Sequence, residues 1–193
     1  MSNVEFRNTC VLYLTATCNL KCRYCYIDKS PVLQKIDKML EDTYKTDYFF
    51  NFMKKVFPNP KQLKEIEFWG GEPSYGLPRV GKTVENAIDY YPNLKDFMMS
   101  TNLTTDRWWD DFSGFIRLLK KYPERKFDFR LQLSLDGPTE VNDINRGDGV
   151  TLLFTKNFSK LIQNIDALLE EVPNVKIYAH FKPTLDNSSI AQL

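Results

Sequence analysis

Short apolar stretches alternate along this chain with longer segments in which apolar side chains recur every three or four residues. Such recurrence is typical of one helix face, whereas brief runs and strict alternation indicate strands. The pattern predicts strands at residues 10–15, 66–69, 96–101, 127–135 and 175–182, and a further helix start after 182. A proline follows each helical stripe within two residues and is expected to end it. The stripes comprise Tyr44, Tyr48, Phe52 and Val56; Val80, Val84, Ala87 or Ile88 and Tyr91; Trp108, Phe112, Phe115, Leu119 and Tyr122; and Phe154, Phe158, Leu161, Ile165, Leu168 and Val172.

Strands that alternate with helices through short connections predict an α/β fold with a parallel sheet. In the fourth predicted strand Phe129, Leu131 and Leu133 share one face, and polar side chains occupy the other. Parallel strands covered by helices on both faces are usually apolar throughout, so the polar face indicates a barrel lumen. A complete eight-stranded barrel takes about 250 residues. Residues 1–193 therefore predict one domain, a partial (β/α) TIM-like barrel of about five parallel strands that ends before a sixth.

The charge balance excludes an electrostatic footprint for nucleic acid or anionic lipid. Lys and Arg number 26 against 25 Asp and Glu, which gives a formal net charge of +1. No apolar run approaches the roughly 18 residues of a membrane helix. The first residues also lack the basic-then-apolar design of a signal peptide. We therefore expect a cytoplasmic protein that binds neither nucleic acid nor a membrane.

The four cysteines, Cys10, Cys18, Cys22 and Cys25, all lie near the amino terminus. Clustered thiols in a reducing compartment indicate a metal or redox site rather than disulfides. The last three follow the first predicted strand, where (β/α) folds carry their functional loops. Structural zinc sites and electron-transfer clusters use four ligands, but Cys10 belongs to an apolar strand, where a buried inert thiol is the simpler interpretation. Three cysteines on a four-iron cluster would leave one iron open, which predicts a catalytic site.

The spacing C-x-x-x-C-x-x-C at residues 18–25, with an aromatic residue before the last cysteine, resembles the signature of the radical S-adenosylmethionine (SAM) enzymes. Further motifs follow in the family's order. Residues 70–73 read G-G-E-P, residues 100–102 read S-T-N, and residues 134–136 read S-L-D. Residues 142–147, N-D-I-N-R-G, resemble the H-D-x-x-R-G stretch of the peptide-modifying and sulfatase-maturing (SPASM-type) subgroup. The resemblance covers nearly the whole chain.

The resemblance implies that Cys18, Cys22 and Cys25 bind three irons of a 4Fe–4S cluster and that SAM chelates the fourth. A flavodoxin- or ferredoxin-like reductant supplies an electron that cleaves SAM. The resulting 5′-deoxyadenosyl radical then abstracts a hydrogen atom from a substrate, which the subgroup makes a peptide or protein. The resemblance assigns no residue of this sequence as a catalytic acid or base. The residues implied to bind SAM are Tyr24 beside the adenine, Gly70, Gly71 and Glu72 at the methionine amino group, Ser134 and Asp136 at the ribose, Arg146 at the carboxylate, and Asn102.

Simpler structural interpretations stand beside these roles. The glycine pair also suits a tight turn between strand and helix, and Asp136 suits an ordinary Asp-Gly-Pro turn. Arg146 is equally typical of a solvated loop, and Tyr24 of a residue that merely flanks the cysteine loop. His180 and Lys182 are interpreted as side chains that line the barrel.

Several departures from the family pattern limit the assignment. Asn142 replaces the subgroup's His, Leu103 replaces the Gly of S-T-N-G, and no cysteine follows Cys25 to ligate an auxiliary cluster. A fifth strand without a neighbour leaves a bare sheet edge, which predicts a partner chain that completes the barrel. The alternative to an enzyme is a non-catalytic iron–sulfur or SAM-binding subunit, and a zinc-binding structural domain is the third hypothesis.

Overall fold

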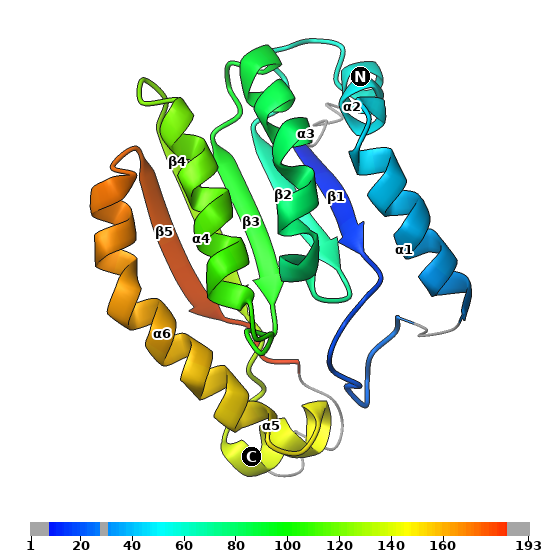
Figure 1. Cartoon of the computed structure of the whole chain (residues 1–193), viewed down its shortest axis with the longest axis vertical. Coiled ribbons are helices and arrows are strands. Elements are labelled where there is room, and N and C mark those ends of the chain that lie inside the picture. The colour runs from blue at the N-terminus through cyan, green and yellow to red at the C-terminus, as the bar shows by residue number, and fades with distance from the viewer. Residues whose placement is uncertain (1–7, 28–30, 185–193) are drawn as a thin grey trace, which may run out of the picture.

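A single parallel sheet with strand order β1-β2-β3-β4-β5 organises the protein (Figure 1). Its strands are β1 (Thr9–Thr15), β2 (Glu65–Gly70), β3 (Asp96–Thr101), β4 (Phe127–Leu133) and β5 (Val175–Phe181). Each strand pairs in parallel with the next in the chain. The computed structural model describes residues 8–27 and 31–184, so most of the segment with the predicted last helix lies outside the described residues. The predicted α/β class and five-stranded partial barrel are confirmed.

Helices connect the strands and cover one face of the sheet, where α3 and α4 lie in front of it in Figure 1. The aromatic side chains of the helices meet those of the strands there. Phe115 of α4 lies edge-on to Phe68 and Phe97, with ring centroids 5.2 and 5.8 Å apart. The helices are α1 (Pro31–Tyr44), α2 (Tyr48–Val56), α3 (Leu77–Tyr90), α4 (Trp108–Leu118), α5 (Thr139–Arg146) and α6 (Val150–Glu171), with single 3-10 turns at η1 (Pro73–Gly76) and η2 (Leu119–Lys121).

The stripe predicted from Tyr44 to Val56 is wrong, because two helices occupy this region. Helix α1 ends at Tyr44, a turn at residues 45–47 follows, and α2 begins at Tyr48. The side chains of Tyr48 and Phe52 are 61% and 52% exposed, and the buried residue of α2 is Met53. Phe49 stacks on Tyr44 with ring centroids 4.3 Å apart. The turn rotates α2, so the face that packs is not the one the spacing indicated.

The alternation predicted for the strands is observed in β4, where the apolar side chains are buried and Arg130 is exposed. In β5 only Val175 is buried, and Phe181 is exposed although its ring lies 6.0 Å from that of Phe158. Strand β5 is therefore covered at its start and uncovered at its end. Among the described residues, no helix has the length and apolar character needed to cross a membrane.

Candidate active site

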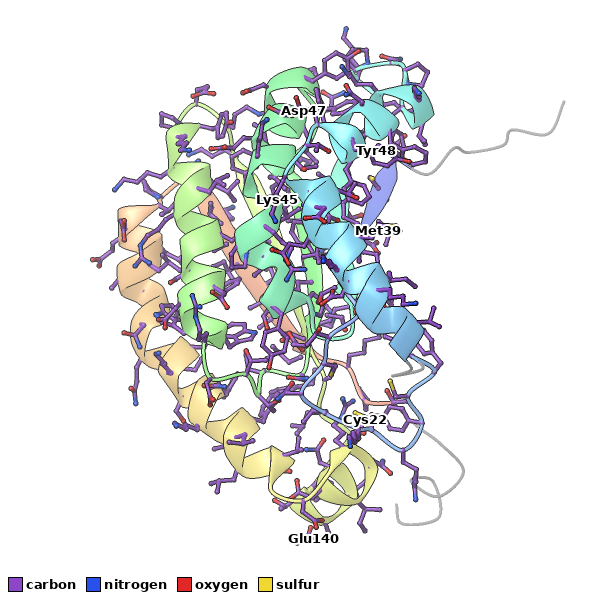
Figure 2. All side chains as sticks on the ribbon, turned by 45° about the vertical axis from the view of Figure 1, so that its right-hand side comes forward. Cys22, Met39, Lys45, Asp47, Tyr48 and Glu140 are labelled. Atoms are coloured by element: carbon purple, nitrogen blue, oxygen red, sulfur yellow. The ribbon has the colours of Figure 1, made fainter. Side chains whose placement is uncertain are left out.

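A pocket of about 300 Å³ opens at the carboxyl ends of the strands. This volume is at the lower end of the range for pockets that hold small ligands. Figure 2 places Cys22 at the same end of the molecule as Glu140 of α5. The residues that line the pocket include Cys18, Cys22, Tyr24, Cys25, Trp69, Gly70, Gly71, Glu72, Ser100, Asn102, Ser134, Arg146 and Lys182. Ten of the eleven residues predicted to bind the cluster or SAM line this pocket, and Asp136 does not.

The three cysteines belong to the loop that leaves β1. Cys18 Sγ accepts hydrogen bonds from Leu20 N at 3.4 Å and from Asn102 Nδ2 at 3.7 Å. Within residues 8–27 and 31–184, no three His, Cys, Asp or Glu side chains lie close enough to hold one metal ion. A 4Fe–4S cluster takes its cysteines on separate irons, so its ligands do not need to converge on one ion. Three thiols that line the same pocket are therefore suitable ligands for a 4Fe–4S cluster.

The start of the cysteine loop is held by Asp37 of α1. Its carboxylate accepts hydrogen bonds from Thr15 Oγ1 at 2.6 Å, Ala16 N at 3.0 Å and Thr17 Oγ1 at 2.8 Å. Burial opposes ionisation of Asp37, but these hydrogen bonds outweigh it and lower the pKa of the carboxyl. Arg79 Nη1 lies 3.7 Å from the same carboxylate. Sequence reasoning missed Asp37, because no motif marks it and α1 itself was not predicted.

The glycine pair allows the chain after β2 to lie against the chain after β1. Gly71 N donates to Thr15 O, and Glu72 N donates to Thr17 O, both at 2.8 Å. A Cβ atom on Gly71 would lie 2.4 Å from Thr17 O, and one on Gly70 would lie 2.3 Å from Thr15 O. The close approach that requires glycine here is therefore an approach of backbone to backbone, along the pocket wall.

Glu72 joins the end of β2 to the end of β3. Its side chain is buried and accepts hydrogen bonds from Thr101 Oγ1 and from Asn102 N, both at 2.7 Å, and from Ser74 N at 3.2 Å. Burial raises the pKa of the Glu72 carboxyl, and the hydrogen bond from Asn102 N is the largest effect that opposes the rise. The carboxyl group predicted at this position is thus present, and three hydrogen-bond donors of the protein already surround it.

Tyr24, Asp136 and Arg146 form one cluster, in which Asp136 and Arg146 are buried and Tyr24 is half-buried. Asp136 accepts hydrogen bonds from the Tyr24 hydroxyl at 2.6 Å, Arg146 Nη2 at 2.7 Å and Thr184 N at 2.9 Å. The side chains of Arg146 and Asp136 are 6% and 0% exposed. Burial, followed by the bond to Asp136, raises the pKa of Tyr24. Arg146 is therefore not solvated in a loop, and Tyr24 does more than flank the cysteines.

One atom of this cluster fits an anionic ligand. Arg146 Nε is buried and has no hydrogen-bond partner among the described residues, although Arg146 lines the pocket. A buried donor without a partner is costly, and native structures rarely contain one. The carboxylate of SAM is an acceptor that would satisfy it. The residues present therefore fit the cofactor as well as the cluster.

The segment that was compared with H-D-x-x-R-G forms helix α5, which the apolar pattern did not predict. Asn142, Asn145 and Arg146 are its buried residues, so its inner face is polar. Asn142 Oδ1 accepts a hydrogen bond from Asp136 N at 3.0 Å, and Asn142 Nδ2 donates to Thr151 Oγ1 at 2.9 Å. Arg23 N and Nη2 donate to Asn145 O and Oδ1 at 2.8 and 2.7 Å. Helix α5 therefore fixes the cysteine loop against the end of β4.

Leu103, which replaces a family glycine, has a φ of 58°. This is the left-handed region, in which a residue other than glycine costs about 1–3 kcal/mol. The Leu103 side chain is fully buried, which offsets part of that cost. Lys182, which lines the pocket, has its Nζ 3.0 Å from Gln132 Oε1 and 5.3 Å from the centroid of the Trp69 ring. His180 is exposed and is not among the residues that line the pocket.

Comparison with known proteins supports a family assignment. The family model of the Radical SAM superfamily matches residues 12–192. An uncharacterized protein of Methanocaldococcus jannaschii is 27% identical over 139 residues, which cover 70% of this chain and 41% of that protein. A solved structure of native anSMEcpe with bound AdoMet aligns with a TM-score of 0.45 and 22% identity over 93% of this chain and 53% of that chain. A second, with bound AdoMet and a peptide, gives 0.45 and 24% over 92% and 51%. The chain thus spans about two fifths of the archaeal protein and about half of the two solved chains.

Proposed function

Because the chain belongs to the radical SAM superfamily, we propose that it is an enzyme that binds a 4Fe–4S cluster through Cys18, Cys22 and Cys25 and cleaves SAM reductively. Held by these three thiols, the cluster would supply one electron for the cleavage of SAM into methionine and a 5′-deoxyadenosyl radical, and hydrogen abstraction from the substrate is the chemistry that this radical would provide. The observation that carries the proposal is that the three thiols line the same pocket as Gly70, Gly71 and Arg146.

In this scheme the protein's own residues bind SAM and orient it. Arg146 offers its unpartnered Nε–H to the carboxylate of SAM, next to the ion pair with Asp136 that fixes the guanidinium. Ser134 lines the pocket, and its hydroxyl is the donor we assign to the ribose. The backbone at Gly70 and Gly71 offers polar groups to the methionine amino group, and the Glu72 carboxylate adds favourable charge. Tyr24 also lines the pocket, and we assign its ring to packing beside the adenine.

The substrate assignment rests on the motifs at residues 100–102 and 142–147, and the electron donor on the resemblance to the family as a whole. We propose a peptide or protein side chain as the substrate, because these motifs resemble the peptide-modifying subgroup. The electron donor we propose is a flavodoxin- or ferredoxin-like protein. A partner chain beside β5 remains part of the proposal, because the described sheet ends there with an exposed Phe181.

Anaerobic reconstitution with iron and sulfide tests the proposal directly. We expect about four irons per chain, an electron paramagnetic resonance (EPR) spectrum that changes when SAM is added, and 5′-deoxyadenosine on addition of a reductant. The matched controls are Cys10→Ala, which should retain all three properties, and Cys18→Ala/Cys22→Ala/Cys25→Ala, which should lose them. Formation of 5′-deoxyadenosine at the level of the triple variant would contradict SAM cleavage. A cluster indifferent to SAM would favour the non-catalytic subunit.

A further inference from the structure

The side-chain amide of Asn102 is held in one orientation. Its Oδ1 accepts hydrogen bonds from Thr104 N at 2.9 Å and from Thr104 Oγ1 at 2.7 Å. A flipped amide would place its NH₂ group against the backbone N–H of Thr104, where two donors would face each other. The nitrogen Nδ2 therefore faces the cysteine loop, where it lies 3.1 Å from Asn19 Oδ1 and 3.7 Å from Cys18 Sγ.

The backbone that carries Asn102 is also fixed, from both sides. Asn102 N donates to the buried Glu72 carboxylate at 2.7 Å. Asn157 of α6 donates through Nδ2 to Leu103 O at 2.9 Å and to Thr105 O at 3.1 Å. Asn102 itself is buried. The position of its Nδ2 relative to Cys18 is thus determined by β2, β3 and α6 and does not depend on a mobile side chain.

A donor fixed at a cysteine sulfur has a chemical consequence. When a thiolate binds an iron–sulfur cluster, hydrogen bonds to its sulfur withdraw negative charge and favour the reduced state, which carries one more negative charge. We propose that Asn102 is a positioning residue that raises the reduction potential of the cluster through an N–H···S hydrogen bond to Cys18. This inference rests on the proposed function only in that Cys18 is a cluster ligand, and it assigns the Asn102 amide to the cluster rather than to SAM.

The test is an EPR-monitored redox titration of the reconstituted protein without SAM. In Asn102→Leu the donor is lost, and we expect the midpoint potential to become more negative than in the wild type. In Asn102→Asp a side chain of the same shape removes the donor and adds negative charge, so the shift should be at least as large. The matched control is Asn157→Leu, which loosens the same 103–105 backbone but keeps the Asn102 amide and its contacts with Glu72 and Thr104, so its potential should shift much less than that of Asn102→Leu.

Each outcome separates this inference from SAM cleavage. Equal potentials in all four proteins, with equal iron content, would overturn the role of Asn102 and leave SAM cleavage unaffected. A shift in Asn157→Leu as large as that in Asn102→Leu would also overturn it, because loop position rather than the donor would then set the potential. The expected shifts in a protein that forms no 5′-deoxyadenosine would support the Asn102 role and contradict only SAM cleavage. A wild-type protein that assembles no cluster would overturn both.

Discussion

Loss of one partner from the buried ion pair between Arg146 and Asp136 should strongly destabilise the protein. The two side chains are 6% and 0% exposed, and Arg146 Nη2 lies 2.7 Å from Asp136 Oδ1. Removal of one partner from a buried pair leaves an uncompensated charge and costs about 3–5 kcal/mol. A domain of this size is stable by about 5–15 kcal/mol in total. We therefore expect Arg146→Met to lower the free energy of unfolding by about 3–5 kcal/mol.

A double-mutant cycle tests whether the loss comes from the pair itself. Asp136→Asn retains an acceptor for the Tyr24 hydroxyl but leaves Arg146 charged and buried, so it should cost a similar amount. In Arg146→Met/Asp136→Asn neither charge remains, so we expect the double variant to be no less stable than either single variant, which corresponds to a coupling energy of at least about 3 kcal/mol. Replacement of both members of a buried pair is often nearly neutral, which gives the sign of this coupling.

The assay is urea unfolding of the cluster-free protein, followed by tryptophan fluorescence under reducing conditions. The control is Lys82→Met, which breaks the surface pair with Asp47, in which the two side chains are 59% and 49% exposed. Such pairs contribute about 0.2–1 kcal/mol. An Arg146→Met variant that loses no more stability than Lys82→Met would refute the reasoning. So would single variants whose effects simply add in the double variant.

Three further predictions concern the residues around the pocket. Gly71→Ala should destabilise the protein by about 1–3 kcal/mol, because its Cβ would lie 2.4 Å from Thr17 O. In Gly114→Ala of α4 the new Cβ meets no atom within 4 Å, so this variant should stabilise the protein by about 0.5–1 kcal/mol. Thermal unfolding of both variants measures the sign of each change. Burial raises the pKa of the Cys10 thiol to about 11, so only about one thousandth of this thiol is ionised at pH 8. Iodoacetamide should therefore label the exposed Cys25 long before Cys10, and mass spectrometry measures the two rates. Because its hydrogen bonds lower the pKa of Asp37, the stability it contributes is complete above the unfolded-state pKa of about 4 and is lost as the pH falls through the lower folded-state pKa. The gap in unfolding free energy between the wild type and Asp37→Asn should therefore be constant near neutral pH and shrink in acid, and a gap that grows in acid would contradict this sign.

Apolar patterning was enough to predict the sheet but not two of its connections. The predicted strands match the observed ones to within two residues, although the alternate burial that was predicted is clear in β4 and absent from β5. Helix α5 buries Asn142, Asn145 and Arg146, so it has no apolar stripe for a pattern to detect. The error at Tyr48 has a related cause, because a three-residue turn shifts the helical phase without any change in spacing.

The sequence predicted which residues form the candidate site better than it predicted the contacts between them. The cysteines, the glycine pair and Glu72 lie in motifs, and the structure brings them to one pocket. Their assignment to the cluster and SAM stays a prediction. Asp37 belongs to no motif, and it holds the cysteine loop through hydrogen bonds to residues 15–17. The spacing of residue types along the sequence therefore gives no signal for it. The pairing of Asp136 with Arg146 joins the end of β4 to the end of α5, and it depends on a helix that the pattern did not reveal.

The hydrogen bonds that fix the cysteine loop to Asp136 and to helix α5 impose an order on biosynthesis. Tyr24 and Asp136 are 112 residues apart in the chain, and Arg23 and Asn145 are 122 apart. At about 5–20 residues per second, translation needs about 6–25 s to supply the partners of a loop that has already been made. Closing so long a loop is also entropically costly, which makes it a late folding step. We therefore expect the thiols to emerge from the ribosome well before the pocket exists, and cluster insertion to follow the synthesis of α5.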